Sequence, residues 1–217
     1  RRAVYRYDPF GRRVQKKVWQ WDAAGGAYVL KTDIRFGWAG WNIVGEVDGG
    51  NVLLRTHQWG LDLSSGFQGA GGIGGLLSTT TMAETLAGRR VPAYDGRGNV
   101  MAMVNITTAD ADSRFDYDGF GGQISATGYS VEEASFRFST KVWDSETGFL
   151  AYQLRFYQPM TGAWISRDRI GESGGFNLYE YVSNNPINAV DPLGLEDWHL
   201  DMSDHGGPHI QNASGRW

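Results

Sequence analysis

The sequence contains no cysteine, which excludes disulfide bonds and cysteine-based zinc sites and leaves the cellular compartment open. It also lacks any apolar run near the length of about 20 residues that a membrane-spanning helix needs. Basic and acidic side chains nearly balance, at 20 against 24. Without a basic excess the chain has no net positive charge that would attract nucleic acid or anionic membranes. We therefore expect this region to bind no nucleic acid and to span no membrane.

Strong helix signals are scarce, whereas glycine and aromatic residues are abundant: 31 Gly, 9 Trp, 10 Tyr and 10 Phe in 217 residues. Aromatic side chains suit the half-buried surface of a sheet, and glycine supplies the positive φ angles of tight turns. This composition favours short strands joined by turns. The chain opens with Arg1 rather than methionine and leads directly into a strand-like segment. We therefore expect it to be a fragment of a longer polypeptide.

One turn motif recurs along the chain, namely tyrosine, aspartate, two further residues and glycine. It occurs at residues 7–11, 94–98 and 117–121, with a degenerate copy at 157–162. Aspartate opens a turn by accepting a hydrogen bond from its own backbone two residues on, and glycine closes it. Alternating strand-like residues flank each copy, so the repeating unit is a β-hairpin. Because one hairpin cannot bury its apolar face, stacked copies must share a core.

A denser series of motifs occupies the last third of the chain. It reads FRF at 136–138, DSETGF at 144–149, RFYQP at 155–159, TGAWISRD at 161–168, GGFNLY at 174–179, NNP at 184–186 and DPLGL at 191–195. Together with the Tyr-Asp turns, this series resembles the RHS repeat-associated core domain of the RHS/YD-repeat proteins. That family includes the C components of insecticidal toxin complexes.

The resemblance implies an all-β fold in which tandem β-hairpin repeats form a strip of a hollow shell, with an inward-turning C-terminal core domain. We expect a hairpin-repeat shell region at 1–135, a core domain at 136–195, and the start of a C-terminal effector at 196–217. The implied protein is a secreted, cell-surface or delivered bacterial toxin. Its first partner is its own toxin domain in cis, and delivery machinery or an immunity protein are further candidates.

The resemblance also implies an aspartic autoprotease that cuts once, after the last leucine of the DPLGL motif. Carried over to this chain, the scissile bond joins Leu195 to Glu196, and the catalytic pair is Asp168 and Asp191. Arg167 matches a basic residue beside the first aspartate. The family usually has proline after that aspartate, whereas this chain has arginine, so the φ restraint of proline is missing there.

Peptide hydrolysis by two carboxylates requires that they share one proton. The ionised group then accepts a proton from water, while the neutral group polarises the scissile carbonyl. A simpler interpretation makes Asp168 and Asp191 turn openers, since both begin an Asp-x-x-Gly sequence, and makes Arg167 a surface cation. Asp-Pro bonds are also acid-labile. Breakage there predicts a new N-terminus at Pro192, whereas the aspartate pair predicts one at Glu196.

Two further segments carry weaker signals. The glycine-rich run at 66–75 superficially matches a dinucleotide-binding loop, but no βαβ unit surrounds it, so a flexible wall loop is favoured and no cofactor is expected. The tail at 199–209 holds three histidines and two aspartates, a set that suits a metal or nuclease site. We prefer the interpretation that the residues from Glu196 onward begin an extended cargo segment, with no metal site.

The many aromatic residues support an alternative function, a non-enzymatic cell-surface or scaffold β-repeat module that binds glycan or protein. Tryptophans in an exposed row would stack on sugars, whereas cross-strand aromatic pairs would only stabilise the sheet. The tryptophans in question are Trp19, Trp21, Trp38, Trp41, Trp59, Trp143 and Trp164.

Overall fold

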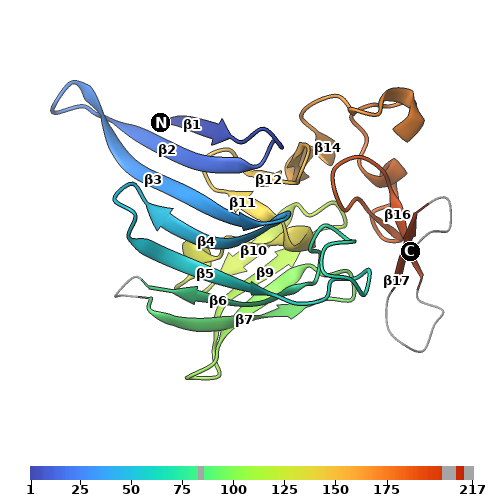
Figure 1. The fold of residues 1–217 in the computed structure, drawn as a ribbon, viewed down its shortest axis with the longest axis horizontal. Helices are drawn as coiled ribbons and strands as arrows, with labels where there is room; N and C mark the ends of the chain where they lie inside the picture. The colour runs from blue at the N-terminus through green and yellow to red at the C-terminus, as the bar shows by residue number, and fades with distance from the viewer. Residues whose placement is uncertain (83–85, 202–208, 213–217) are drawn as a thin grey trace.

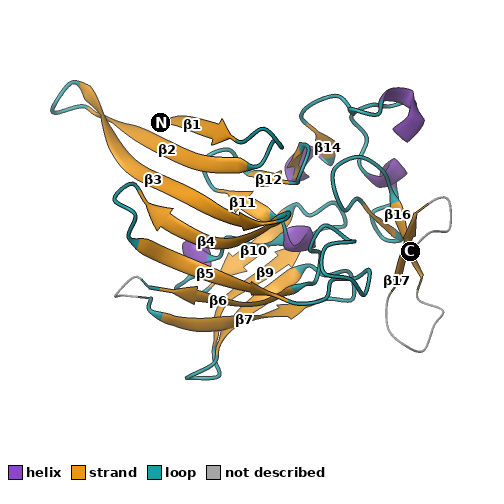
Figure 2. Ribbon diagram, viewed as in Figure 1, coloured by secondary structure: helices purple, strands orange, loops and turns teal. Residues whose placement is uncertain are grey.

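The computed structural model describes residues 1–82, 86–201 and 209–212. These residues form three antiparallel sheets, with only short 3-10 turns in addition (Figures 1 and 2). Ten strands follow one another in sequence order across the large sheet. They are β1 (Arg2–Tyr7), β2 (Arg13–Asp22), β3 (Ala27–Ala39), β4 (Asn42–Asp48), β5 (Leu53–Trp59), β6 (Leu76–Thr81), β7 (Gly88–Tyr94), β8 (Val100–Asn105), β9 (Ala111–Tyr117) and β10 (Gln123–Thr127). The all-β class and the tandem hairpins are confirmed.

Two smaller sheets complete the fold. The four-stranded sheet comprises β11 (Val142–Asp144), β12 (Phe149–Ala151), β13 (Phe156–Gln158) and β14 (Ala163–Trp164). The three-stranded sheet comprises β15 (Ala189–Val190), β16 (Trp198–Asp201) and β17 (His209–Asn212). The 3-10 turns are η1 (Val131–Glu133), η2 (Phe138–Thr140), η3 (Pro159–Thr161), η4 (Gly171–Gly174) and η5 (Val182–Asn184). The domain boundaries at 135/136 and 195/196 stay predictions.

The repeated Tyr-Asp motif forms the same turn each time. In each of the three full copies the aspartate Oδ1 accepts hydrogen bonds from the backbone N–H groups two and four residues later, at 2.8–3.0 Å. The glycine adopts a positive φ of 74–85°, which side chains rarely tolerate. The aspartates are Asp8, Asp95 and Asp118. The turns join β1 to β2, β7 to β8 and β9 to β10. The degenerate copy at 157–162 has glutamine in place of the aspartate and forms the 3-10 turn η3 instead.

A fourth turn of this kind joins β4 to β5 and carries no Tyr-Asp signature. Asp48 Oδ1 accepts hydrogen bonds from the N–H groups of Gly50 and Val52 at 2.8 and 2.9 Å. Asn51 occupies the glycine position with a φ of 66°, because asparagine tolerates the left-handed region better than other side chains. The sequence motif missed this copy because Val47 and Asn51 replace the tyrosine and the glycine.

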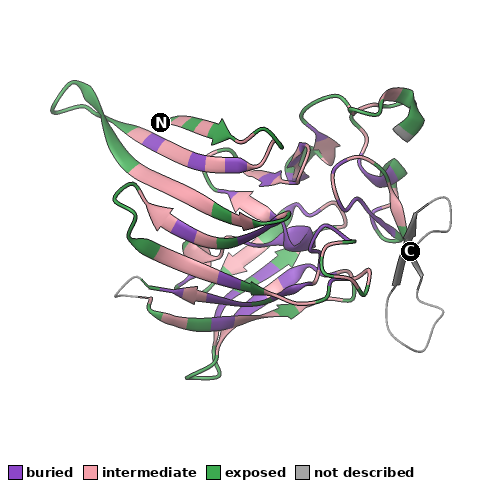
Figure 3. Cartoon of the chain, in the orientation of Figure 1, coloured by how far each residue is buried: buried purple, intermediate pink, exposed green. Residues whose placement is uncertain are grey.

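Residues that follow the large sheet cover its apolar face. Phe136 packs with buried residues of three strands, including Ile43 and Met103. It meets Trp59 edge-on, with ring centroids 5.2 Å apart. In Figure 3 buried segments lie on strands of the large sheet and also in the turns and loops that follow it. The described fold thus places the C-terminal segments against one side of the repeat sheet.

The tryptophans serve mainly as packing residues. Of the seven named above, only Trp21 is classed as exposed, at 51%, and it contacts Tyr28 across the β2–β3 hairpin. Trp164 lies in the core of the small sheet, and Trp38 and Trp59 pack against the core of the large one. An exposed aromatic row is therefore not formed by these residues, which removes the main support for a glycan-binding surface.

We expect that Asp95→Ala lowers the free energy of unfolding by about 1–2 kcal/mol, as does the loss of a capping aspartate at a helix start. The substitution removes the acceptor for the N–H groups of Arg97 and Asn99. The control is Asp110→Ala, which changes an exposed aspartate in the β8–β9 turn whose side chain accepts no hydrogen bond from a described residue. Equal urea-unfolding curves for the two variants would contradict the role of the Asp95 side chain.

Candidate active site

The DPLGL motif lies in the loop that joins β15 to β16. Its Asp191 accepts three hydrogen bonds at Oδ1, from the N–H groups of Leu193 (3.2 Å), Gly194 (2.7 Å) and Leu195 (3.0 Å). Gly194 has a φ of 82°. This is the turn of the Tyr-Asp repeats, built again at the end of the chain. The expected scissile bond, Leu195–Glu196, follows directly after the last of these N–H groups.

Asp168 opens a turn of its own, after β14. Its Oδ1 accepts a hydrogen bond from the N–H of Ile170 at 2.9 Å, and Gly171 has a φ of 62°. The backbone N–H of Asp168 donates to the carbonyl of Leu178 at 3.0 Å. The turn therefore forms without the proline that the family usually has after this aspartate.

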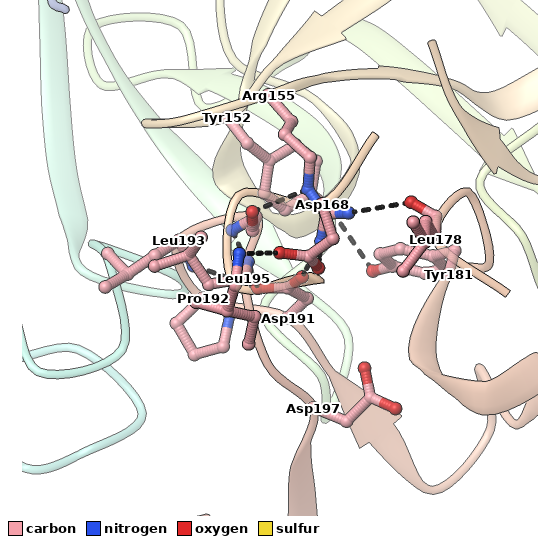
Figure 4. Close-up of polar contacts among 12 residues, drawn as sticks. Tyr152, Arg155, Asp168, Leu178, Tyr181, Asp191, Pro192, Leu193, Leu195 and Asp197 are labelled. Atoms are coloured by element: carbon pink, nitrogen blue, oxygen red, sulfur yellow. Dashed lines mark hydrogen bonds and ion pairs between the residues drawn. The ribbon is translucent and has the colours of Figure 1, made fainter. Parts of the chain in front are cut away.

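Arg155 joins the two carboxylates. Its Nη2 lies 2.8 Å from Asp168 Oδ2 and 3.3 Å from Asp191 Oδ2. Figure 4 shows both carboxylates turned toward Arg155, with the side chain of Asp197 apart from them. Each aspartate thus uses Oδ1 for its turn and presents Oδ2 to one shared nitrogen. The turn-opening and the paired-carboxylate interpretations therefore do not exclude each other.

These charged groups are held away from water. The side chains of Arg155, Asp168 and Asp191 are 3%, 8% and 1% exposed. The Arg155 guanidinium also lies 4.1 Å over the ring of Trp164, a cation–π contact. Burial raises the pKa of the Asp191 carboxyl to about 6, against the opposing effect of its backbone N–H donors and of Arg155.

The backbone before Leu195 is hydrogen-bonded at every carbonyl of residues 192–194. Each acceptor has a donor from a different residue outside the loop. The bonds run from Lys141 Nζ to Pro192 O (2.8 Å), from the Leu154 N–H to Leu193 O (3.0 Å), and from Arg155 Nε to Gly194 O (2.6 Å). The next carbonyl, that of Leu195, accepts no hydrogen bond from a described residue. This is the carbonyl that hydrolysis would attack.

A small cavity of about 10 Å³ lies beside Leu195. Its lining includes Leu195, Arg155, Asp168 and Asp197, but not Asp191. Such a volume accommodates about one water molecule, and the lining offers several polar partners. On the far side of the expected cut, Asp197 Oδ2 accepts a hydrogen bond from the Ser183 hydroxyl at 2.7 Å. Burial raises the pKa of Asp197.

The glycine-rich run differs from the flexible loop that its composition suggests. Ala70 and Ile73 are fully buried, and they pack with Val190 directly before the DPLGL motif. Asp62 Oδ2 accepts hydrogen bonds from the N–H groups of Ala70 and Gly72, at 2.8 and 3.0 Å. The glycines permit close packing against the C-terminal turn, so their role here is steric.

The remaining predicted residues have different placements. Arg167 is exposed and forms no ion pair with a described residue, so the cation beside both carboxylates is Arg155. Arg155 begins the RFYQP motif, but nothing in its sequence spacing indicates a contact with the aspartates. In the histidine-rich tail, residues 202–208 lie outside the described residues, and most of the histidine and aspartate cluster noted there lies outside them too. Among the described residues no group of three or more metal-ligating side chains is found.

No family model matches the chain. It is 29% identical over 204 residues to double-stranded DNA deaminase toxin A of Burkholderia cenocepacia, covering 88% of this chain and 14% of that protein. It is 30% identical over 200 residues to RhsA of Dickeya dadantii, whose name describes it as a probable deoxyribonuclease; this covers 89% of the chain and 12% of RhsA. The chain therefore spans a small part of each relative.

Among solved structures, the crystal structure of TcdB2-TccC3-TEV matches 89% of this chain and 9% of its own, with a TM-score of 0.63 and 22% identity. This likeness establishes a shared fold. Together the comparisons define a class, relatives of Rhs and Tc toxin components. The resemblance to the RHS repeat-associated core, seen first in the motifs, is thereby confirmed. None of the helices among the described residues is long and apolar enough to cross a membrane.

The raised pKa of Asp191 predicts a pH-dependent stability. The folded state holds this proton up to about pH 6, whereas the ordinary value is 3.8. The resulting stabilisation is complete below about pH 4 and is lost as the pH rises through 6. Relative to Asp191→Asn, wild type should therefore lose roughly 2–3 kcal/mol of unfolding free energy between pH 4 and 7. Urea unfolding of chains shown by mass spectrometry to be intact measures this, and a pH-independent difference contradicts it.

Proposed function

We propose that this chain is part of the shell wall of an RHS toxin and that it releases a C-terminal toxin by cutting itself once, after Leu195. The observation that carries the proposal is the meeting of Asp168 and Asp191 at one nitrogen of Arg155, beside a backbone whose preceding carbonyls are all bound. The similarity to a protein named as a toxin supports the same setting for this chain, that of a secreted or delivered bacterial protein.

The two carboxylates have different surroundings, which suggests their roles. Asp168 lines the small cavity, so it is placed to accept a proton from a water molecule there. Asp191 is the more deeply buried group with the raised pKa, so it is the one that is neutral in mildly acidic solution. Its Oδ1 is occupied by three N–H groups, which leaves Oδ2 to carry the proton.

Hydrolysis then proceeds with a closed proton balance. The water oxygen bonds to the carbonyl carbon of Leu195 as Asp168 takes one water proton, and the Asp191 proton stabilises the developing oxyanion. When the C–N bond breaks, the nitrogen of Glu196 leaves as an amine after accepting a proton from the pair. The proton of the new Leu195 carboxyl passes to the amine, so the products are a carboxylate on Leu195 and an ammonium N-terminus at Glu196, and one proton remains on the aspartate pair. The reaction occurs once per molecule because enzyme and substrate are the same chain.

The large sheet supports the encapsulating part of the proposal. Its strands follow sequence order, and β1 and β10 are its edges in the described residues. An open edge presents unpaired N–H and C=O groups, at which further hairpins can extend the sheet. A longer strip of the same hairpins would form a wall around a cargo held in cis. Delivery machinery and an immunity protein are proposed as partners of the whole toxin.

The first test locates the cut and its dependence on the aspartate pair. We expect wild type to yield a fragment that begins at Glu196, and both Asp168→Asn and Asp191→Asn to slow cleavage by at least about 100-fold, as expected for the loss of a general acid or base. Mass spectrometry and N-terminal sequencing measure both.

A matched control is available within the chain, because Asp8 begins a second Asp-Pro-x-Gly turn. Asp8→Asn should leave cleavage at wild-type rate. Intrinsic lability of Asp-Pro bonds would instead release fragments that begin at Pro9 and Pro192. Cleavage that persists unchanged in both Asp168→Asn and Asp191→Asn would overturn the proposal.

A second test compares the two candidate cations. Arg155→Lys keeps the charge but cannot reach Gly194 O and both carboxylates at once, so we expect cleavage to slow by at least about tenfold. Arg167→Lys should have little effect because Arg167 is exposed. The reverse ranking in a time course of Leu195–Glu196 cleavage would assign the cationic role to Arg167.

A further inference from the structure

We propose that Lys141 is a positioning residue for the cleavage, one that fixes the substrate backbone against the glycine-rich loop at 66–75. The inference rests on the proposed function and extends it to a part of the molecule that the aspartate pair does not involve. Lys141 follows η2 and lies 50 residues before Asp191 in the chain. No sequence motif connects the two.

Lys141 makes three hydrogen bonds, one in each of three separate segments. Nζ donates to Pro192 O and Gly71 O, both at 2.8 Å, and to Gln153 Oε1 at 3.1 Å. The residue is 3% exposed, and its ammonium lies 5.0 Å over the ring of Tyr152. Three acceptors match the three protons of an ammonium group, so the charged form alone satisfies every contact.

The glycine-rich loop is shaped to accept this contact. Gly71 has a φ of 58°, and a Cβ added there would overlap the carbonyl oxygen of Pro192. Gln153 Nε2 also donates to Gly71 O, at 2.8 Å. The loop, Lys141 and Gln153 are thus joined by hydrogen bonds beside the peptide that follows Asp191. We call the set Gly71, Lys141 and Gln153 the lysine seat.

The lysine seat affects the position of the reacting groups, because Lys141 binds the turn that Asp191 opens. The Pro192 carbonyl belongs to the residue directly after Asp191, whose carboxylate must reach both Arg155 and the Leu195 N–H. If Pro192 shifts, the carboxylate and the scissile peptide move relative to each other. Small displacements of reacting groups cost large factors in rate, because catalysis depends on near-attack geometry.

The surroundings of Lys141 also predict a pH signature. Burial lowers the pKa of Lys141 to about 7, and the nearby carboxylates of Asp191 and Asp62 oppose that shift. Tyr152 is the other titratable group facing it, and burial raises the pKa of its phenol well above the usual value. Above about pH 7 the amine loses one donor, so one of the three contacts of the lysine seat is lost.

The test follows Leu195–Glu196 cleavage of the full chain by mass spectrometry after pulsed cell-free synthesis. We expect Lys141→Met to slow cleavage at pH 6 by at least tenfold. Lys16→Met removes a lysine that pairs with Asp144 and Glu146 and with neither catalytic aspartate, so its rate should stay within twofold of wild type. The wild-type rate should fall above about pH 6 as Asp191 loses its proton, and it should fall a second time above about pH 7 as Lys141 loses one. Lys141→Arg should not show this second fall, a difference that a purely structural role does not predict.

Gly71→Ala tests the seat without removing the lysine. Its matched control is Gly26→Ala, which imposes a similar backbone strain at a φ of 61° but meets no atom within 4 Å. Cleavage should be slow only in Gly71→Ala, and this comparison decides the question if Lys141→Met does not fold. Wild-type rates in Lys141→Met and Gly71→Ala, with Asp168→Asn uncut, would overturn this inference alone. Wild-type cleavage in both aspartate variants would overturn the proposed function instead.

Discussion

The structure depends on one recurring interaction, an aspartate oxygen that closes its own turn by accepting N–H groups from two and four residues on. It joins successive strands of the large sheet at Asp8, Asp48, Asp95 and Asp118. The same interaction recurs at Asp191, where the N–H four residues on is that of Leu195. The repeated turn therefore fixes a carboxylate relative to the peptide a few residues later. The proposed self-cleavage requires the same thing of Asp191.

What distinguishes Asp191 from Asp8 is its environment, since both begin an Asp-Pro-x-Gly sequence. The Asp8 side chain is 15% exposed and pairs with Arg12 of its own turn. The Asp191 side chain is 1% exposed and meets Arg155, which also binds Asp168. Burial disfavours the ionised form, which raises the pKa of Asp191 into a range useful for acid catalysis. Identical local chemistry thus gives a structural turn in one place and a candidate reactive group in another.

The proposed cleavage also requires that the peptide before the cut is held in place, and the residues that bind this peptide are remote in the chain. The carbonyls of residues 192–194 are bound by groups from residues 141, 154 and 155, and the glycine-rich loop closes against them. Buried carbonyls are costly to leave without hydrogen bonds, so these contacts stabilise the loop in the conformation described. The glycine-rich loop belongs to the connection between β5 and β6 of the large sheet. It therefore links that sheet to the loop that Asp191 opens.

Local chemistry by itself determined much of this protein. Aspartate and glycine spacing predicted the hairpin turns, because those turns are closed by side chains within five residues, and the ordered motifs indicated the RHS relationship and the positions of Asp168 and Asp191. The turn at Asp48 was not predicted, because asparagine replaces glycine at the position with positive φ. Tertiary structure alone decided that Arg155 contacts both carboxylates, rather than Arg167, which precedes Asp168 in the chain. It also decided that Lys141 binds Pro192 and that the glycine-rich run contains buried residues. These contacts join residues far apart in the chain, and no local pattern encodes which distant groups packing will bring together.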